Sequence, residues 1–291
     1  MRSPYLLENR HVAVKRCRHG LMMFSRNDLF VGRSLDAYGE WCDFEIQLMR
    51  VFLKAGDVAI DAGANIGTHT IAFANSVGPQ GRVHAFEPMR RNFCMLAGNV
   101  ALNALENVVC HQKAVGAVNG EISVPVLPDP EISYNYSAIH LSEESKQGER
   151  VPIVTLDSLD LQACRVIKID TEGMEDKVLD GAQALIKRCR PLIYLENNEA
   201  GASERLAKAL DKINYQAWWS ISPHYEQNNF YSNFENFWPN VVPATNLICA
   251  PKEANLQIGL DPFTGPKDDW KASLQRVGYM RPFQPKYGPQ A

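Results

Sequence analysis

In one short stretch, DAGANIG, aspartate, glycine and asparagine take alternate positions, directly after an apolar run. Asp61, Gly63, Asn65 and Gly67 stand two residues apart, and a helix-like run begins directly after them. Glycines in such a turn let the backbone approach a ligand closely. The free N–H groups of a helix N-terminus also bind polar or anionic groups. The spacing therefore predicts that a ligand is held at this turn.

The charges around the turn select among ligands. A nicotinamide or flavin dinucleotide favours Gly-x-Gly-x-x-Gly, but here an acid ends the strand and Asn65 replaces the second glycine. An acid suits an ammonium or a hydroxyl, and Glu87, which ends the next strand inside FEP, can accept both hydroxyls of a ribose. S-adenosylmethionine carries these groups, so the residues favour it. The alternative is that Gly63 and Gly67 only permit tight packing while Asp61 caps a turn.

Further acids end two later strands. Asp170 follows the apolar run VIKI, where an unpaired carboxylate is costly, so a functional role is favoured. Glu172 has equal claims to function and to structure, whereas the helix macrodipole explains Glu175 and Asp176. Glu196 ends PLIYLE at the same edge. With Asp170 it could hold a divalent cation, but two carboxylates are too few for us to predict a metal.

Methyl transfer to a hydroxyl would need a general base near the acceptor. His224 is our first choice, because it follows a strand on the crevice side and histidine titrates near neutrality. Asp170 is the second choice, while His69 and His111 are expected to be structural. The aromatic stretch 225–238 forms either a wall for a sugar or apolar acceptor, or a cover over the end of the sheet.

The elements that position these residues alternate between strands and helices from Gly56 onward. The predicted strands are 58–61, 82–87, 108–115, 166–170, 191–196, 216–221 and 245–250. The predicted helices are 66–76, 89–103, one that runs from Glu175 to beyond Ile186, and 202–213. Such alternation predicts a parallel sheet with helices on both faces, and ligands bind beyond the carboxyl ends of its strands.

Three parts are predicted along the chain. Residues 1–54 form a hairpin turning near His19 and a helix through Trp41 and Phe52, which together cap the main domain. Residues 55–251 form the S-adenosylmethionine-binding domain, and 252–291 a C-terminal extension. The polar stretch 128–150 is expected to be a loop or lid, and the tail from Pro262 to wrap the surface or fray.

Composition excludes several other classes. Among 291 residues, 30 basic and 33 acidic side chains give a net charge of -3, which argues against a nucleic-acid binder. The seven cysteines are scattered without a Cys-x-x-Cys pair, so we expect neither disulfides nor a zinc site but a reducing, cytoplasmic setting. No apolar run approaches the ~20 residues of a membrane helix, so no transmembrane segment is predicted.

From about Gly20 to Pro251 the chain resembles the FkbM family of methyltransferases. The motifs that carry the resemblance are GEWCDFE, DAGANIGTHT, HAFEP, the Asn99/Asn103 spacing, IKIDTEGMEDKVLDGA and RPLIYLEN.

The resemblance implies an α/β class I methyltransferase fold: a Rossmann-like, mostly parallel, seven-stranded sheet with helices on both faces and an antiparallel last strand. It implies S-adenosylmethionine-dependent O-methylation of a small hydroxylated acceptor, such as a sugar, glycolipid or polyketide-like natural product. The implied cofactor residues are Asp61, Gly63, Asn65, Gly67 and Glu87, with Asp170, Thr171 and Glu172 at the methyl-transfer end. An NAD-dependent oxidoreductase and a non-catalytic cofactor-binding partner protein are the alternatives, and a homo-oligomer is left open.

Overall fold

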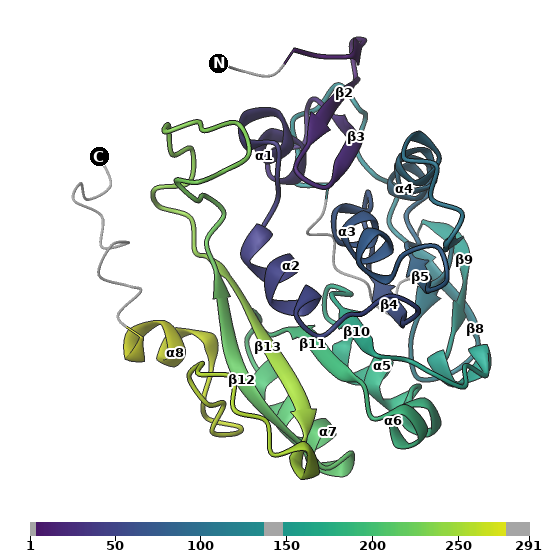
Figure 1. The fold of residues 1–291 in the computed structure, drawn as a ribbon, viewed down its shortest axis with the longest axis vertical. Coiled ribbons are helices and arrows are strands. Elements are labelled where there is room, and N and C mark those ends of the chain that lie inside the picture. The colour runs from purple at the N-terminus through teal and green to yellow at the C-terminus, as the bar shows by residue number, and fades with distance from the viewer. Residues whose placement is uncertain (1–3, 137–147, 278–291) are drawn as a thin grey trace.

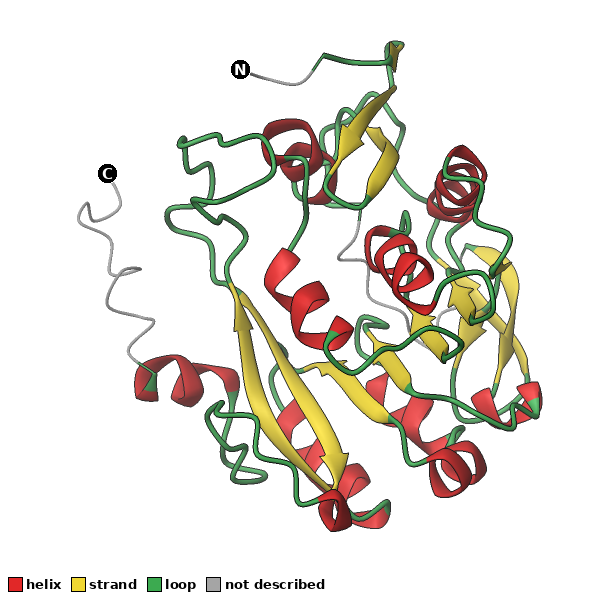
Figure 2. Cartoon of the chain, in the orientation of Figure 1, coloured by secondary structure: helices red, strands yellow, loops and turns green. Residues whose placement is uncertain are grey.

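A seven-stranded sheet forms the centre of the molecule (Figures 1 and 2). The computed structural model describes residues 4–136 and 148–277. The strand order is β12-β13-β11-β10-β4-β5-β6, and β13 runs antiparallel to both of its neighbours while the other pairs are parallel. The predicted fold class is therefore confirmed. The strands are β4 Val58–Ala62, β5 Arg82–Phe86, β6 Val108–His111, β10 Val166–Ile169, β11 Leu192–Glu196, β12 Tyr215–Ser222 and β13 Ala244–Pro251.

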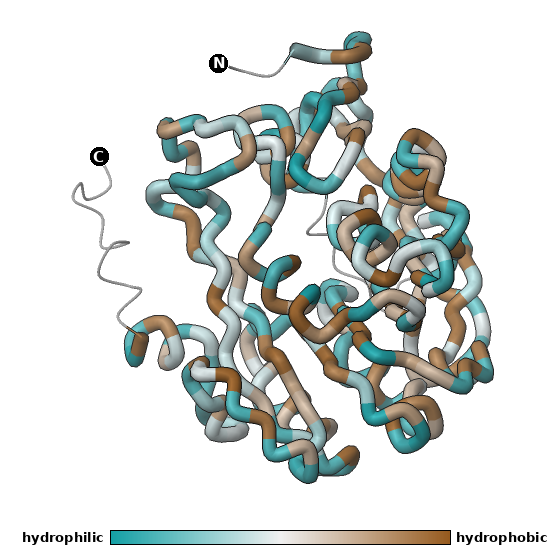
Figure 3. Tube along the Cα trace, viewed as in Figure 1, coloured by the Kyte–Doolittle hydropathy of each residue, from teal (hydrophilic) through white to brown (hydrophobic). Residues whose placement is uncertain are grey.

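Helices cover both faces of the sheet (Figure 1). On one face lie α2 Asp43–Arg50, α3 Thr68–Val77 and α4 Arg90–Leu102; on the other lie α5 Glu175–Asp180, α6 Gln183–Cys189 and α7 Ala202–Lys212. The strands are apolar on both sides, as buried parallel strands are, and the strands at the centre of Figure 3 are correspondingly rich in hydrophobic residues. Alternate residues of one strand point to opposite helix layers: Ile60 packs against α5 and α6, and Ala59 against α3.

The N-terminal part contains a three-stranded sheet of β1 Leu7–Glu8, β2 Val12–Cys17 and β3 Gly20–Ser25, followed by α1 Val31–Tyr38. The hairpin predicted near His19 is confirmed. The Asn99/Asn103 spacing attaches this hairpin to α4, because the Asn99 side chain bonds both the N–H and the carbonyl of Met23, and Asn103 those of Leu21. The hairpin is therefore fixed to the main sheet through α4.

Two predicted elements are interrupted, and a third is shorter than predicted. The single strand over 108–115 is wrong, because the chain leaves the large sheet after β6 and forms β7 Ala114–Val115 in a second sheet with β8 Gly120–Val124 and β9 Glu149–Val154. The single helix from Glu175 breaks between α5 and α6 at Gly181, where a Cβ would lie 2.0 Å from the carbonyl oxygen of Gly116. The predicted helix through Trp41 and Phe52 is shorter, because Cys42 has a left-handed φ of 44°.

The C-terminal segment packs along the outer edge of the large sheet. The 3-10 turn η2 Lys252–Ala254 follows β13, and α8 Trp270–Arg276 is the last helix among the described residues; another 3-10 turn, η1 Leu156–Leu159, precedes β10. The N–H of Trp219 on β12 donates to the carbonyl of Asp261 at 2.8 Å. Asp268 accepts a hydrogen bond from the Trp219 indole at 3.0 Å. This part of the predicted tail therefore wraps the surface. Residues 137–147 of the predicted lid and residues 278–291 lie outside the described residues.

Candidate functional site

The turn after β4 is built around residues that tolerate a left-handed backbone. Gly63 has φ 80°, and a Cβ there would lie 1.7 Å from the carbonyl oxygen of Asp170, so only glycine fits this close approach. Asn65 and Gly67 also have positive φ values, 49° and 93°. α3 begins at the next residue, Thr68. The two-residue spacing seen in the sequence thus folds into a tight strand-to-helix turn pressed against the end of β10.

Glu87 links this turn to the next one. Its Oε2 accepts the N–H of Asn65 at 2.9 Å, and its Oε1 accepts the N–H of Met89 at 2.8 Å. Burial raises the pKa of the carboxyl to about 7, although the two N–H donors and the charge of Lys168 lower it. Each carboxylate oxygen can accept a second hydrogen bond. Glu87 is therefore oriented by the protein and still able to receive the two ribose hydroxyls predicted for it.

Lys168 joins the two strand-end acids. Its ammonium lies 3.3 Å from Asp61 Oδ1, 3.1 Å from Asp170 Oδ2, and 3.0 Å from the carbonyl oxygen of Gly63, to which it donates. Burial alone would lower the pKa of this lysine, but the charges of Asp170 and Asp61 raise it above its ordinary value. Asp61 is fully buried and also accepts a hydrogen bond from Thr70 at 2.6 Å. In this geometry the Asp61 carboxylate pairs with Lys168 and accepts a hydrogen bond from Thr70. Its contact with the ligand therefore stays a prediction.

Three carboxylates converge beyond β10 and β11. The closest oxygens of Asp170, Glu172 and Glu196 lie within 4.8 Å of one another. Burial and then the charge of Asp170 raise the pKa of Glu172 to about 9, and the same two causes, in the same order, raise the pKa of Glu196 well above its ordinary value. The sequence identified all three residues but grouped only Asp170 and Glu196 as ligands for a cation. Oxygens this close are within reach of one ion, and Lys168 already offsets the charge of Asp170.

Thr171 and Glu175 shape the turn between β10 and α5. The Glu175 carboxylate accepts hydrogen bonds from the N–H and the hydroxyl of Thr171, and from the N–H of Gly173. These contacts support the structural role that the sequence favoured for Glu175. Glu172, the residue between Thr171 and Gly173, has a left-handed φ of 52°.

A cavity of about 570 Å³ lies at the carboxyl ends of these strands, a size typical of small-molecule sites. Its lining includes Gly63, Asn65, Glu87, Met89, Thr171, Asp170, Glu172, Glu196, Glu45, His69, Asn246, Trp41 and His224. Of the predicted cofactor residues, Asp61 and Gly67 are not among the described residues that line it. The cavity thus brings most of the predicted residues together and adds others.

His224 lies on the cavity wall with both ring nitrogens engaged. Nε2 is 3.0 Å from the carbonyl oxygen of Val242, and because a carbonyl can only accept, Nε2 carries the proton. Nδ1 lies 3.6 Å from the sulfur of Cys42, and the ring stacks on Trp41 with centroids 5.1 Å apart. Burial lowers the pKa of His224. The base role predicted for His224 therefore depends on Nδ1 leaving the Cys42 thiol.

The aromatic stretch 225–238 packs on the N-terminal helices. Trp238 stacks on Phe30 at 5.0 Å and belongs to a buried cluster with Tyr38, whereas Phe234 is 79% exposed. None of the six aromatic residues of this stretch is among the described residues that line the cavity. The packing supports the second reading of the stretch, a cover over the end of the sheet. The cavity takes its aromatic lining from elsewhere, notably Trp41 and Trp270.

The sequence did not identify Glu45 and His69, two of the ionisable residues of the lining, as functional. Glu45 comes from α2 and His69 from the first turn of α3, and both are 5% exposed. We expected His69 to be structural and did not single out Glu45. The only sequence signal for Glu45 is its place at the end of the motif GEWCDFE.

The fold and the turn together define a class I S-adenosylmethionine-dependent methyltransferase. The residues present fit the cofactor: the turn packs Gly63 against the carbonyl of Asp170 and lines the cavity with Gly63 and Asn65, and Glu87 presents oriented acceptor oxygens to the same cavity. The family model described as the methyltransferase FkbM domain matches residues 61–217, just over half of the chain. The chain therefore belongs to the FkbM methyltransferase family, and its cofactor is S-adenosylmethionine.

Solved structures with a similar fold include several methyltransferases. Methyltransferase FkbM from Methylobacillus flagellatus is 16% identical with a TM-score of 0.42, and the match covers 67% of this chain but 43% of that one. TYW2 of M. jannaschii in complex with AdoMet is 14% identical with a TM-score of 0.43, covering 84% and 87%. An S-adenosylmethionine-dependent O-methyltransferase of Thermotoga maritima is 15% identical with a TM-score of 0.41, covering 72% and 64%. No curated protein matches the chain.

Two further findings bear on the setting of the protein. All seven cysteines are free thiols. Within residues 4–136 and 148–277, no helix is both long enough and apolar enough to cross a membrane.

Proposed function

We propose that this methyltransferase acts on a hydroxyl oxygen of a small polyhydroxylated molecule, such as a sugar, a glycolipid or a polyketide-like natural product. The observation that carries the proposal is the mixed lining of the cavity, where the Trp41–His224 stack and the carboxylates of Asp170 and Glu196 border the same space. Carboxylates accept hydrogen bonds from hydroxyls, and flat rings pack against the apolar faces of sugars and polyketides.

The proposed roles follow the position of each residue along the cavity. Gly63 and Asn65 bring the backbone to the methionine and ribose, Glu87 accepts the ribose hydroxyls, and Thr171 and Glu172 border the methyl-transfer end. Bound S-adenosylmethionine supplies an electrophilic methyl carbon on a positively charged sulfur. Asp170 favours the binding of that charge, and the attraction weakens as the charge disappears, so Asp170 contributes more to affinity than to rate. Holding the acceptor oxygen at about 3 Å from the methyl carbon then supplies much of the catalysis.

Two measurements test this function. Calorimetric titration with S-adenosylmethionine, S-adenosylhomocysteine and NAD should give binding of the two sulfur nucleotides only, much weakened in Glu87→Ala. Incubation with ¹³C-methyl-labelled cofactor and a panel of glycosides and polyketides should yield a methyl ether, whose methyl carbon is recognised by its NMR shift. Methyl transfer to nitrogen, carbon or sulfur alone would refute the oxygen-directed proposal and leave the family assignment intact.

A further inference from the structure

A hydroxyl acceptor must release a proton, and the acids nearest the predicted methyl-transfer end are poorly suited to take it. Asp170 is paired with the Lys168 ammonium at 3.1 Å. Glu172, with its pKa raised to about 9 by burial and by the charge of Asp170, holds its own proton at neutral pH. His224 is engaged on both nitrogens by Val242 and Cys42. A base must therefore be sought among the other residues of the cavity lining.

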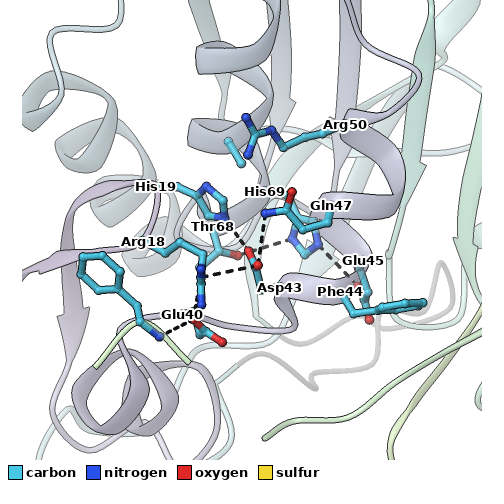
Figure 4. A network of polar contacts seen from close by, with 12 residues as sticks. Arg18, His19, Glu40, Asp43, Phe44, Glu45, Gln47, Arg50, Thr68 and His69 are labelled. Carbon is cyan, nitrogen blue, oxygen red and sulfur yellow. Dashed lines mark hydrogen bonds and ion pairs between the residues drawn. The ribbon is translucent and has the colours of Figure 1, made fainter. Parts of the chain in front are cut away.

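His69 and Glu45 form a buried pair at this wall of the cavity (Figure 4). Nε2 of His69 lies 3.4 Å from Oε2 of Glu45, and Nδ1 lies 3.4 Å from the hydroxyl oxygen of Thr68, which also lines the cavity. Nε2 is a buried nitrogen with no hydrogen-bond partner among the described residues. Glu45 approaches Nε2 without forming a hydrogen bond, so this nitrogen keeps its hydrogen-bonding capacity, which is uncommon in a folded interior.

Glu45 is fixed in place from a third element. Its Oε1 accepts a hydrogen bond from Nδ2 of Asn246 at 2.9 Å, and the same nitrogen lies 3.2 Å from the hydroxyl of Tyr194. Besides His69, the charge of Glu45 acts on Cys42, Tyr194 and His224. Burial and then this charge raise the pKa of the Cys42 thiol and of the Tyr194 phenol. Both groups therefore stay neutral near pH 7, and neither competes for the proton.

We propose that the His69–Glu45 pair accepts the proton of the acceptor hydroxyl; the inference rests on the hydroxyl-directed function proposed above. The acceptor oxygen forms a bond to the methyl carbon, and the electron pair of the broken carbon–sulfur bond stays on sulfur. The hydroxyl proton passes to the imidazole of His69, and Glu45 remains a carboxylate beside the new imidazolium. A nucleophile whose base is oriented by an acid is a recurrent catalytic arrangement.

The position of the carboxylate supports this role. Glu45 Oε2 lies 3.4 Å from the ring that receives the proton, so the positive charge that forms there has an opposite charge beside it.

A second histidine–acid pair in the chain offers a matched control for the variants. His19 and Asp43 form a second histidine–acid pair, 2.6 Å apart, in which Asp43 is the first residue of the same helix as Glu45 (Figure 4). Neither His19 nor Asp43 is among the described residues that line the cavity. A purely structural histidine–acid pair should therefore behave alike at both places, whereas a catalytic pair should not.

The experiment compares His69→Gln and Glu45→Gln with His19→Gln and Asp43→Asn. Initial rates of methyl transfer to glycoside acceptors are measured from pH 5 to 9, and affinity for S-adenosylhomocysteine is measured by calorimetry. We expect His69→Gln to lower kcat by about 10²–10⁴-fold and to remove the acid limb of the pH profile, with cofactor affinity within threefold of wild type. The control variants should keep kcat within threefold and retain the acid limb. Loss of kcat in all four variants alike, or retention in His69→Gln, would overturn the proposal.

A second measurement does not require an acceptor, so it separates failure of this inference from failure of the hydroxyl-directed function. The imidazole nitrogen shifts of His69 are recorded by NMR in the S-adenosylhomocysteine complex, with His69→Gln for assignment. A neutral ring at pH 7.5 that becomes charged on acidification supports a base, even if no hydroxyl acceptor in the panel is methylated. A ring that stays an imidazolium up to pH 9 is a permanent ion pair with Glu45, and the proposal then fails.

Discussion

Replacing Lys168 by methionine removes the cation at the centre of the cofactor turn. The ammonium forms ion pairs with the carboxylates of Asp61 and Asp170 and donates a hydrogen bond to the carbonyl of Gly63. Asp61 is fully buried, so without Lys168 its carboxylate loses its counter-charge and retains the hydrogen bond from Thr70. Breaking a buried pair in this way costs about 3–5 kcal/mol. The Asp170 carboxylate is 41% exposed, so its share is screened and adds at most about 1 kcal/mol.

We therefore expect Lys168→Met to lose about 3–5 kcal/mol of unfolding free energy at pH 7, measured by urea denaturation. The folded-state pKa of Lys168 is raised, so its stabilisation is fully present below the ordinary lysine value of 10.5 and is lost only as the pH rises through the higher folded value. The deficit of the variant should therefore be constant from pH 7 to 9 and shrink at more alkaline pH. Affinity for S-adenosylhomocysteine should fall at least tenfold, because the Gly63 carbonyl loses its anchor.

Lys208→Met is the control for this experiment. Lys208 pairs with Glu204 at 2.7 Å one helical turn away on the surface, with its side chain 69% exposed. Such an exposed pair contributes little to stability. If Lys168→Met resembled Lys208→Met in stability and left the affinity for S-adenosylhomocysteine unchanged, the electrostatic account of the turn would be refuted.

Three further outcomes are expected at the site. Gly63→Ala should abolish cofactor binding in calorimetry, because its Cβ would lie 1.7 Å from the carbonyl oxygen of Asp170; binding within threefold of wild type would contradict the close approach. Glu87 has its pKa raised to about 7 by burial, and the ribose hydroxyls donate to the charged form, so affinity should increase as the pH rises from 6 to 8. Glu87→Gln should bind weakly at every pH, and an unchanged slope in that variant would assign the titration to another group. Trp41→Ala should raise the KM for the acceptor with little effect on cofactor affinity, whereas Trp238→Ala, buried against Phe30 and Tyr38, should lower the thermal midpoint by calorimetry; the reverse pattern would return the acceptor wall to 225–238.

Much of the cofactor half of the site could be predicted from the sequence because it depends on local rules. Strands in an alternating α/β chain run parallel, so Asp61, Glu87, Asp170 and Glu196, each at or next to a strand end, had to gather at one edge. What could not be predicted is how chain segments change sheets. The apolar residues 108–115 look like one strand, but Ala114 pairs with Ile153 of β9, a partner 39 residues later.

The acceptor half depends on contacts between distant segments, which leave no periodic signal. Glu45 and His69 are 24 positions apart and meet only because α2 lies beside α3. Trp41 faces the cavity because Cys42 turns the chain with a left-handed φ. The aromatic residues after His224 suited an acceptor wall and a hydrophobic cover equally, and Tyr225, Phe237 and Trp238 pack with Tyr38 of α1. A composition that suits a binding wall equally suits a hydrophobic cover, and only the docking partner decides between them.

The two halves of the site also come from different parts of the chain. Gly63, Asn65, Glu87 and Asp170 lie inside the segment that matches the FkbM domain, residues 61–217. The residues Trp41, Glu45, His224 and Asn246 lie outside it, yet they line the same cavity. The residues proposed for the cofactor therefore lie in the matched segment, whereas the flanking chain supplies part of the remaining lining. Changes in those flanks can alter which acceptor fits without disturbing the turn that holds the methyl donor.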